Sequence, residues 1–169
     1  MVRLQHLLGL KDLGHDVFVL ELLRSTGDAH RDRQRIKSFF KGLKRYGLND
    51  QCALLLYDKN AGQSFESADV YGKSRREVRD TIKDADLLWN DCCGVRQPLL
   101  GMFRHRVLID LDPGHLQVSA LTVNMDLQYH DTFLTVGKKL HDADCEVPTL
   151  GFSWHTFVPV IYLPLWDFA

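Results

Sequence analysis

The amino-acid sequence predicts an α/β fold, a doubly wound parallel sheet of about five strands with helices on both faces. Apolar runs alternate along the chain with segments of helical periodicity. Each apolar run is continuous rather than alternating, as in strands that are buried on both faces. The 169 residues, 45% of them hydrophobic and 25% charged, suit one globular domain with a real core.

The first part of the chain predicts two helices, each followed by a strand. Residues 2–13 carry leucines at helical spacing, and Gly14 is a natural stop. The run HDVFVLE at 15–21 is β-branched and aromatic, which predicts a buried strand. Helical spacing returns over 29–46, where the dense basic residues indicate a solvated face. CALLLYD at 52–58 predicts the next strand.

The rest of the chain continues the alternation and then loosens. The predicted elements are a polar helix at 73–85, strands at 86–91 and 106–112, a helix at 116–127 and a strand at 131–137. Beyond them, prolines rule out a long helix: Pro148, Pro159 and Pro164. The apolar tail must pack on something or expose a large patch. Together with an N-terminus that begins directly in a helix, this tail predicts a piece of a larger protein.

Charge and cysteine content narrow the classes of partner. The formal net charge of -1 gives no reason to expect a nucleic-acid surface. No apolar run approaches the roughly 18 residues of a membrane span. The four cysteines match no zinc or disulfide framework, so we expect reduced thiols in a cytoplasmic protein, with no metal and no cofactor.

The stretch RVLIDLDPGHLQ at 106–117 is the most informative motif, and it has two interpretations. Asp110 and Asp112 lie two apart at the end of an apolar run, followed at once by Pro113 and Gly114. Asp112 is a good helix N-cap and Pro113 suits a first helical turn, so the motif could be structural. Ligands of open α/β sheets bind at the carboxyl ends of strands, so the motif could equally line a binding site.

A catalytic interpretation of this motif is a phosphatase of the haloacid dehalogenase type. The nucleophile strand of that family ends in two aspartates two apart, which Asp110 and Asp112 resemble. The family usually has Thr or Val where this chain has Gly114. It also places its aspartate strand early in the domain, whereas here the strand is the fourth.

Three further groups of residues are candidates. Asn90 and Asp91 end a predicted strand and could line a cleft, although both residues also favour turns. Trp154 and His155 could form an aromatic platform for a sugar, although packing of the tail explains Trp154 equally well. His6 and His15 flank the first predicted helix, and one of them could act as an acid or base, but the sequence shows no carboxylate partner for either.

Several stretches, in order, resemble the N-terminal half of bacterial glycosyltransferases with the GT-B fold. QHLLGLKDLGHDVFVLE at 5–21 resembles the first helix and second strand of that half. Three later segments of this chain resemble further strand–loop units of the same half: ADLLWND, RVLIDLDPGHLQ and DTFLTVGKKL. The segment from VPTLGFSW into the tail resembles the approach to the interdomain linker.

This resemblance implies a Rossmann-like domain over 1–150, lacking its first strand, followed by an apolar, linker-like tail over 151–169. It implies a domain that holds the acceptor, a small molecule or glycan, and binds a nucleotide-sugar only when joined to a second domain. The chain lacks that donor domain and the glycine-rich turn where such enzymes often place a base, so the catalytic residues are unknown. Residues expected to contact the acceptor are Asn90, Asp91, Asp110, Asp112, His115, Gln117, Trp154 and His155.

The first functional hypothesis is therefore the acceptor-side half of a glycosyltransferase, inactive alone. In the intact enzyme, an acceptor hydroxyl would displace a nucleotide diphosphate from the sugar. A second hypothesis is a non-catalytic interaction module, with the apolar tail forming a homodimer or binding a partner chain. The phosphatase is the third.

Overall fold

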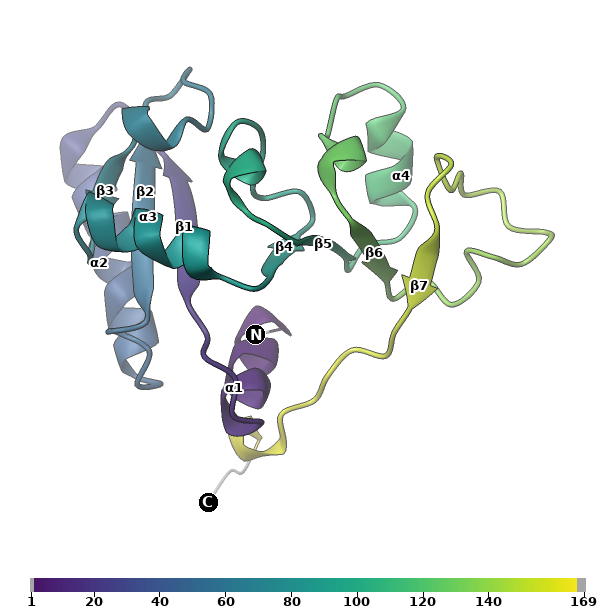
Figure 1. Ribbon diagram of the computed structural model, residues 1–169, viewed down its shortest axis with the longest axis horizontal. Coiled ribbons are helices and arrows are strands. Elements are labelled where there is room, and N and C mark those ends of the chain that lie inside the picture. The colour runs from purple at the N-terminus through teal and green to yellow at the C-terminus, as the bar shows by residue number, and fades with distance from the viewer. Residues whose placement is uncertain (1, 167–169) are drawn as a thin grey trace.

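The computed structural model describes residues 2–166 and has a mixed α/β architecture, which confirms the predicted fold class (Figure 1). The strands form two sheets rather than one. Figure 1 shows the sheets side by side, with β1 and β4 as their neighbouring edges and with the last described residues of the tail near helix α1. Among the described residues, no helix has the length and apolar composition that a membrane crossing needs.

The first sheet has three strands in the order β1-β2-β3. Strands β1 (Val19–Arg24) and β2 (Cys52–Tyr57) are parallel and are joined through helix α2 (Ala29–Lys44). The short strand β3 (Asp69–Tyr71) is antiparallel to β2 and lies between the predicted strand at 52–58 and the predicted helix at 73–85. Strand β1 begins at Val19 rather than at the predicted residue 15, because Val19 is the first residue that pairs with β2, opposite Cys52.

The second sheet has four strands, all parallel, in chain order. They are β4 (Leu88–Asp91), β5 (Arg106–Asp110), β6 (Thr132–Thr135) and β7 (Trp154–Thr156). The predicted single sheet of about five strands thus becomes seven strands in two sheets. Strand β7 falls inside the predicted tail at 151–169, so part of that tail belongs to the sheet.

The remaining helices cover the sheets. Helix α1 (Val2–Asp12) and helix α3 (Arg75–Asp84) agree closely with the predicted segments. Helix α4 (His115–Ala120) is much shorter than the predicted 116–127 segment, whose second half contains β-branched residues. Short 3-10 helices lie at Phe65–Ser67, Leu99–Met102, Leu127–Tyr129 and Leu163–Leu165.

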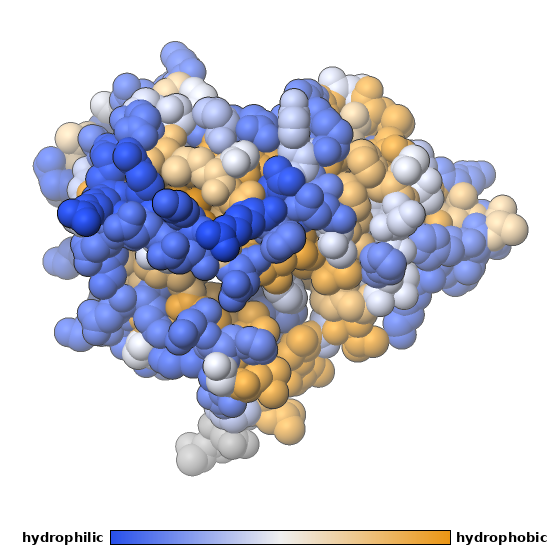
Figure 2. Space-filling model, viewed as in Figure 1, coloured by the Kyte–Doolittle hydropathy of each residue, from blue (hydrophilic) through white to orange (hydrophobic). Residues whose placement is uncertain are grey.

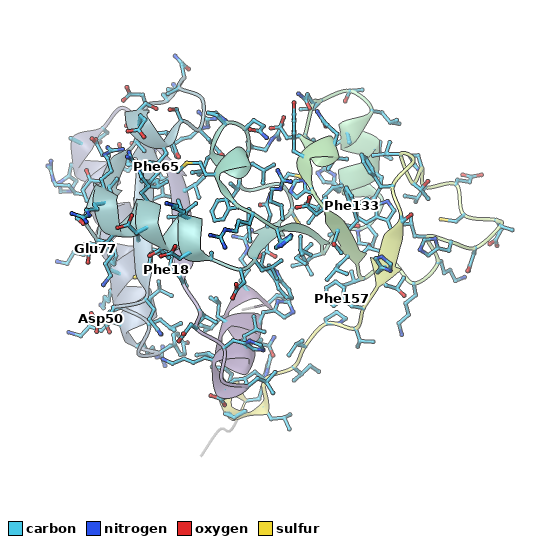
Figure 3. The ribbon with its side chains drawn as sticks, viewed as in Figure 1. Phe18, Asp50, Phe65, Glu77, Phe133 and Phe157 are labelled. Atoms are coloured by element: carbon cyan, nitrogen blue, oxygen red, sulfur yellow. The ribbon has the colours of Figure 1, made fainter. Side chains whose placement is uncertain are left out.

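Two apolar clusters form the interior, and Figure 3 shows Phe65 with the first and Phe133 with the second. The first cluster joins side chains of both sheets beneath α3, including Leu55 of β2 and Leu88 of β4. The second lies between α4 and the strands β5 to β7, including Leu108 and Phe133. Because the first cluster contains residues of both sheets, it holds the sheets together without strand pairing between them.

The tail packs on α1, as the sequence required of it, but incompletely. The Gln5 side-chain oxygen accepts hydrogen bonds from the Tyr162 backbone N–H and from Trp166 Nε1, both at 3.0 Å. The Tyr162 hydroxyl donates to Asp12 at 2.5 Å. Apolar surface is visible at the lower centre of Figure 2, where α1 and the tail lie. Three tail residues remain largely exposed: Val158, Ile161 and Leu163.

Candidate functional site

The carboxyl edge of the four-stranded sheet holds a buried polar network centred on Asp110. Asp110 ends β5 and is fully buried. Its carboxylate accepts hydrogen bonds from Thr135 Oγ1 at 2.7 Å, Gln117 Nε2 at 2.9 Å and the Asp112 backbone N–H at 3.0 Å. The Gln117 and Thr135 side chains are buried, so without Asp110 these two donors would lack a partner in the interior. Asp110 therefore ties β5, β6 and α4 together.

The loop after Asp110 differs from the predicted cap. Helix α4 begins at His115 and its N-cap position is Gly114, so the prediction of Asp112 as the capping residue is wrong. Gly114 adopts a φ of 96°, a left-handed value that a side chain would strain. Gln117 Oε1 accepts the Gly114 backbone N–H at 2.7 Å, so Gln117 bonds both ends of the loop. Asp112 and His115 are left exposed.

The neighbouring loop after β6 lies directly against this one. A Cβ atom placed on Gly137 would lie 2.8 Å from the Cβ of Pro113, closer than side-chain atoms approach. Glycine at 137 therefore lets the two loops touch. The Gly137 backbone N–H also donates to Thr135 Oγ1 at 3.0 Å, which continues the Asp110 network. The loops at this edge of the sheet are thus fixed in position rather than open.

At the end of β4, the Asn90 side chain holds the following loop in place through hydrogen bonds. It accepts from the Val95 backbone N–H and donates to the Val95 carbonyl, both at 2.9 Å. Asn90 Nδ2 also lies 2.9 Å from His130 Nε2. Burial lowers the pKa of His130, which favours the neutral ring that accepts this bond. The loop that Asn90 holds places Cys92 and Cys93 at φ of 47° and 57°, which is sparsely populated backbone for non-glycine residues.

Asp91 connects β4 to the first helix. Its carboxylate lies 2.9 Å from Arg3 Nε and accepts Trp89 Nε1 at 3.0 Å. One turn along α1, His6 packs against the Trp89 ring with centroids 5.0 Å apart. His6 is buried and neither ring nitrogen has a hydrogen-bond partner. Burial lowers the pKa of His6 and outweighs the opposing charge of Asp91.

The last candidates, Trp154 and His155, point to opposite sides of β7. Trp154 is buried in the second core, packs edge-on against Phe133 at 5.2 Å, and donates from Nε1 to the Thr149 carbonyl at 3.0 Å. Its indole is occupied by packing, which agrees with the alternative that the sequence left open. His155 is exposed. The two residues form no shared platform.

The predicted site residues therefore divide into two groups. Four are buried with their polar side-chain atoms bonded inside the protein: Asn90, Asp110, Gln117 and Trp154. Four retain exposure: Asp91, Asp112, His115 and His155. The first group shapes the edge of the sheet, and only the second group can reach a ligand directly.

The carboxyl end of β1 carries a second fixed turn that sequence reasoning missed. Asp32 of α2 accepts Ser25 Oγ at 2.5 Å, Thr26 Oγ1 at 2.9 Å and the Thr26 backbone N–H at 3.0 Å. Together these hydrogen bonds lower the pKa of Asp32 to about 2. The bond from the Ser25 hydroxyl lowers it most, followed by the bond from the Thr26 backbone N–H. The run STGD at 25–28 does carry a sequence signal, because Ser, Thr and Asp directly before a helix are typical capping residues.

Two more residues were missed at the four-stranded edge. Thr135 bonds Asp110, and Arg3 pairs with Asp91. Thr135 could have been found, because it lies near the carboxyl end of the predicted strand 131–137, as Asp110 does in 106–112, and the carboxyl ends of parallel strands share one edge. Arg3 gave no such signal, since nothing local shows which strand a helix residue meets.

Within residues 2–166, neither a metal-binding cluster nor the hollow beside α4 coincides with the predicted site. A hollow of ≈ 160 Å³ lies between the end of α4 and Phe152, and none of the predicted site residues lines it. Across residues 2–166, no group of three histidine, cysteine or carboxylate side chains is arranged to hold a metal ion.

The sequence matches no known protein family, and neither a curated protein nor a solved structure matches it.

Proposed function

We propose that this chain is the acceptor-side half of a glycosyltransferase, which would transfer a sugar from a nucleotide-sugar to an acceptor hydroxyl when completed by a donor-binding domain. One observation supports the proposal most. The segments ending in LLWND, LIDLD and TFLTVG are consecutive parallel strands, β4, β5 and β6, whose carboxyl ends share one edge. The resemblance assigns the same three segments, in this order, to strand–loop units of an acceptor-side domain.

The chemistry of that edge suits hydroxyl groups. Asp112 and His115 are exposed on the loop that Asp110 and Gln117 hold in place. A carboxylate accepts hydroxyl hydrogens, and an imidazole can donate or accept. Because the loop is fixed before binding, little ordering would oppose the contact. These two side chains are the proposed acceptor contacts.

The test is acceptor binding by the chain alone. Backbone amide shifts would be recorded by NMR while mono- and oligosaccharides are titrated, with a nucleoside diphosphate in a separate titration. We expect saturable shifts around residues 111–117 with a sugar acceptor and none with the nucleotide. The variant Asp112→Ala with His115→Ala should abolish the shifts, whereas His30→Ala, a change at an exposed histidine of α2, should not. No saturable shift with any sugar would contradict the proposal.

A second candidate function is an interaction module, and the exposed tail favours it. Val158, Ile161 and Leu163 are each about two-thirds exposed, at 69%, 68% and 70%. Sedimentation of the chain as a dimer that becomes monomeric after Val158→Ser, Ile161→Ser and Leu163→Ser would support this function. The phosphatase hypothesis is not favoured, because the Asp110 carboxylate is buried and accepts three hydrogen bonds inside the protein. A phosphate ester cannot reach it.

A further inference from the structure

The hollow at the end of α4 has a lining of a different kind from the predicted acceptor site. It measures ≈ 160 Å³, and its apolar lining residues are Ala120, Met125, Leu127, Leu150 and Phe152. The other two described residues around it, Asn124 and Gln128, carry side-chain amides. Among the residues that the structure describes, none with a charged side chain lines this space, which we call the α4 hollow.

One wall of the α4 hollow, residues 124–128, is fixed by the buried side chain of Asp126. Its carboxylate accepts hydrogen bonds from Arg96 Nε at 2.8 Å and from the Gln97 backbone N–H at 3.2 Å. Arg96 also donates to the Asn124 carbonyl. Since Asp126, Arg96 and Gln97 do not line the hollow, these bonds hold the wall in place without filling the space.

The opposite wall, formed by Leu150 and Phe152, is held just as firmly. The Phe152 ring stacks on Phe133 of β6, with centroids 4.4 Å apart and planes 23° from parallel. The Thr149 carbonyl accepts the Phe152 backbone N–H at 3.1 Å and Trp154 Nε1 at 3.0 Å. Leu150 adopts a φ of 58°, which is uncommon for a residue other than glycine. Strained residues of this kind cluster at ligand sites, where the surrounding structure must hold them.

The size and polarity of the α4 hollow narrow the class of ligand. A cavity of about 150 Å³ holds one benzene ring, so the hollow has room for a single ring. An ion placed there would lose water without gaining an opposite charge, which favours a neutral ligand. Gln128 is exposed, and its amide offers both a donor and an acceptor. Asn124 Oδ1 accepts the Asp126 backbone N–H at 3.0 Å, which leaves the Asn124 NH₂ group to donate.

We propose that the α4 hollow binds a neutral molecule made of one aromatic ring with a hydrogen-bond donor and acceptor on its edge, as in an aromatic carboxamide. The ring lies among Met125, Leu127 and Phe152, and its polar edge meets the amides of Asn124 and Gln128. Because both walls are fixed before binding, little ordering opposes entry of the ring. This site is separate from the proposed sugar contacts, since neither Asp112 nor His115 lines the hollow.

The exposed tail of a second copy fits this chemistry less well. Its most exposed side chains, Val158, Ile161 and Leu163, are aliphatic. Seated in the α4 hollow, they would take the Asn124 and Gln128 amides out of water without pairing them, which costs free energy. A ring that carries its own donor and acceptor avoids that cost.

The test titrates the full chain with benzamide while backbone amide shifts are recorded by NMR. We expect saturable shifts at Met125, Gln128 and Phe152, with half-saturation at millimolar concentrations, as suits a ligand of so few atoms. Nuclear Overhauser contacts should join the benzamide ring protons to the Met125 methyl group. Sugar binding is read at residues 111–117 in its own titration, so failure of either proposal leaves the other standing.

Three related molecules separate the features that the α4 hollow should recognise. Toluene keeps the ring and lacks the amide, so it should bind about tenfold more weakly than benzamide. Isobutyramide keeps the amide and lacks the aromatic ring, so it should give no saturable shift. Benzoate has the shape of benzamide but carries a charge, and it should bind at least about tenfold more weakly.

Substitutions in the lining make the test specific. Gln128→Ala removes one amide, so it should weaken benzamide about tenfold and leave toluene unchanged. Ala120→Phe fills the α4 hollow and should abolish binding of both molecules. If Ala120→Phe prevents folding, Gln128→Ala still carries the test, because Gln128 is exposed. Val118→Ala, at an exposed residue of α4 outside the lining, is the matched control and should change neither affinity.

Four results would overturn the proposal. The first is no saturable shift with benzamide, or shifts that persist unchanged in a folded Ala120→Phe variant. The second is binding of benzoate or isobutyramide as tight as that of benzamide. The third is equal weakening of benzamide and toluene by Gln128→Ala, because the amide would then not be recognised. The fourth is the same shifts produced by raising the protein concentration alone, with a dimer in sedimentation experiments, which would make a second copy the occupant.

Discussion

Strands β1 and β2 make an instructive pair, because they look alike in sequence and differ in burial. Each has six residues, and VLELLR and CALLLY are both largely apolar. In β2, five of the six residues are buried, whereas none in β1 is. Strand β2 has a neighbour on each side and β1 has only one. Burial of an apolar strand is therefore decided by its neighbours, which lie elsewhere in the chain.

The largest expected difference is in the cost of truncating a leucine. Leu55→Ala in β2 should destabilise the protein by about 3 kcal/mol, because it leaves a cavity in a closed core. Leu22→Ala in β1 should cost only about 1 kcal/mol, since that side chain is already partly exposed. Urea denaturation followed by circular dichroism measures both. Equal costs would contradict the view that β1 has an open edge.

The next effect concerns β5, a strand with neighbours on both edges. Asp110→Ala should destabilise the protein by about 3 kcal/mol, because it leaves buried donors of Gln117 and Thr135 unpaired. Asp112→Ala, two residues along and exposed, is the matched control and should change stability by less than about 0.5 kcal/mol. The midpoint and slope of urea denaturation distinguish the two variants.

A smaller effect at the end of β1 should depend on pH. The folded pKa of Asp32, about 2, is below its ordinary value of 3.8. The stabilisation from its hydrogen bonds is therefore complete above pH 3.8 and is lost as the pH falls through about 2. Thermal unfolding across this range should lose stability in the native chain and change less in Asp32→Asn. A parallel pH profile for Asp28→Asn, the neighbouring N-cap residue whose carboxylate bonds two backbone N–H groups, shows whether the effect belongs to Asp32.

The smallest effect is chemical and leaves stability unchanged. Cys92 and Cys93 are adjacent at the end of β4, yet Cys92 is exposed and Cys93 buried. Burial raises the pKa of Cys93 to about 12, so it carries almost no reactive thiolate at pH 8. Brief treatment of the folded protein with iodoacetamide should label Cys92 and spare Cys93 in peptide mass spectra. Labelling of both at the same rate would show that the end of β4 opens readily.

The sequence predicted elements well where a local pattern determines them. Helical spacing placed α2 at 29–46, close to Ala29–Lys44, and the apolar run at 52–58 placed β2. The sequence did not predict the elements that depend on a neighbouring strand elsewhere in the chain. Strand β7 has three residues beside a proline-rich tail and exists because β6 offers it an edge. The 116–127 segment keeps helical apolar spacing, but its β-branched second half does not continue the helix beyond Ala120.

The candidate site follows the same division. The sequence predicted Asp110 and Gln117 as acceptor contacts, whereas in the structure the two side chains bond each other near the end of β5. It could not tell that Asp110 would be fully buried or that Asp112 would not cap the helix, since both depend on Gly114 and on the loop after β6. The burial of Trp154 depends on Phe133, a residue far away in the chain.

The bonds from Gln5 to Tyr162 and Trp166 also bear on how the fold tolerates rearrangement. They bring the beginning and end of the described chain side by side, as Figure 1 shows. A short linker could join those ends, and new termini could be opened in the exposed 141–144 turn without cutting a strand. The fold is therefore suited to circular permutation, in which α1 would no longer lead the chain but would follow the tail that it packs against.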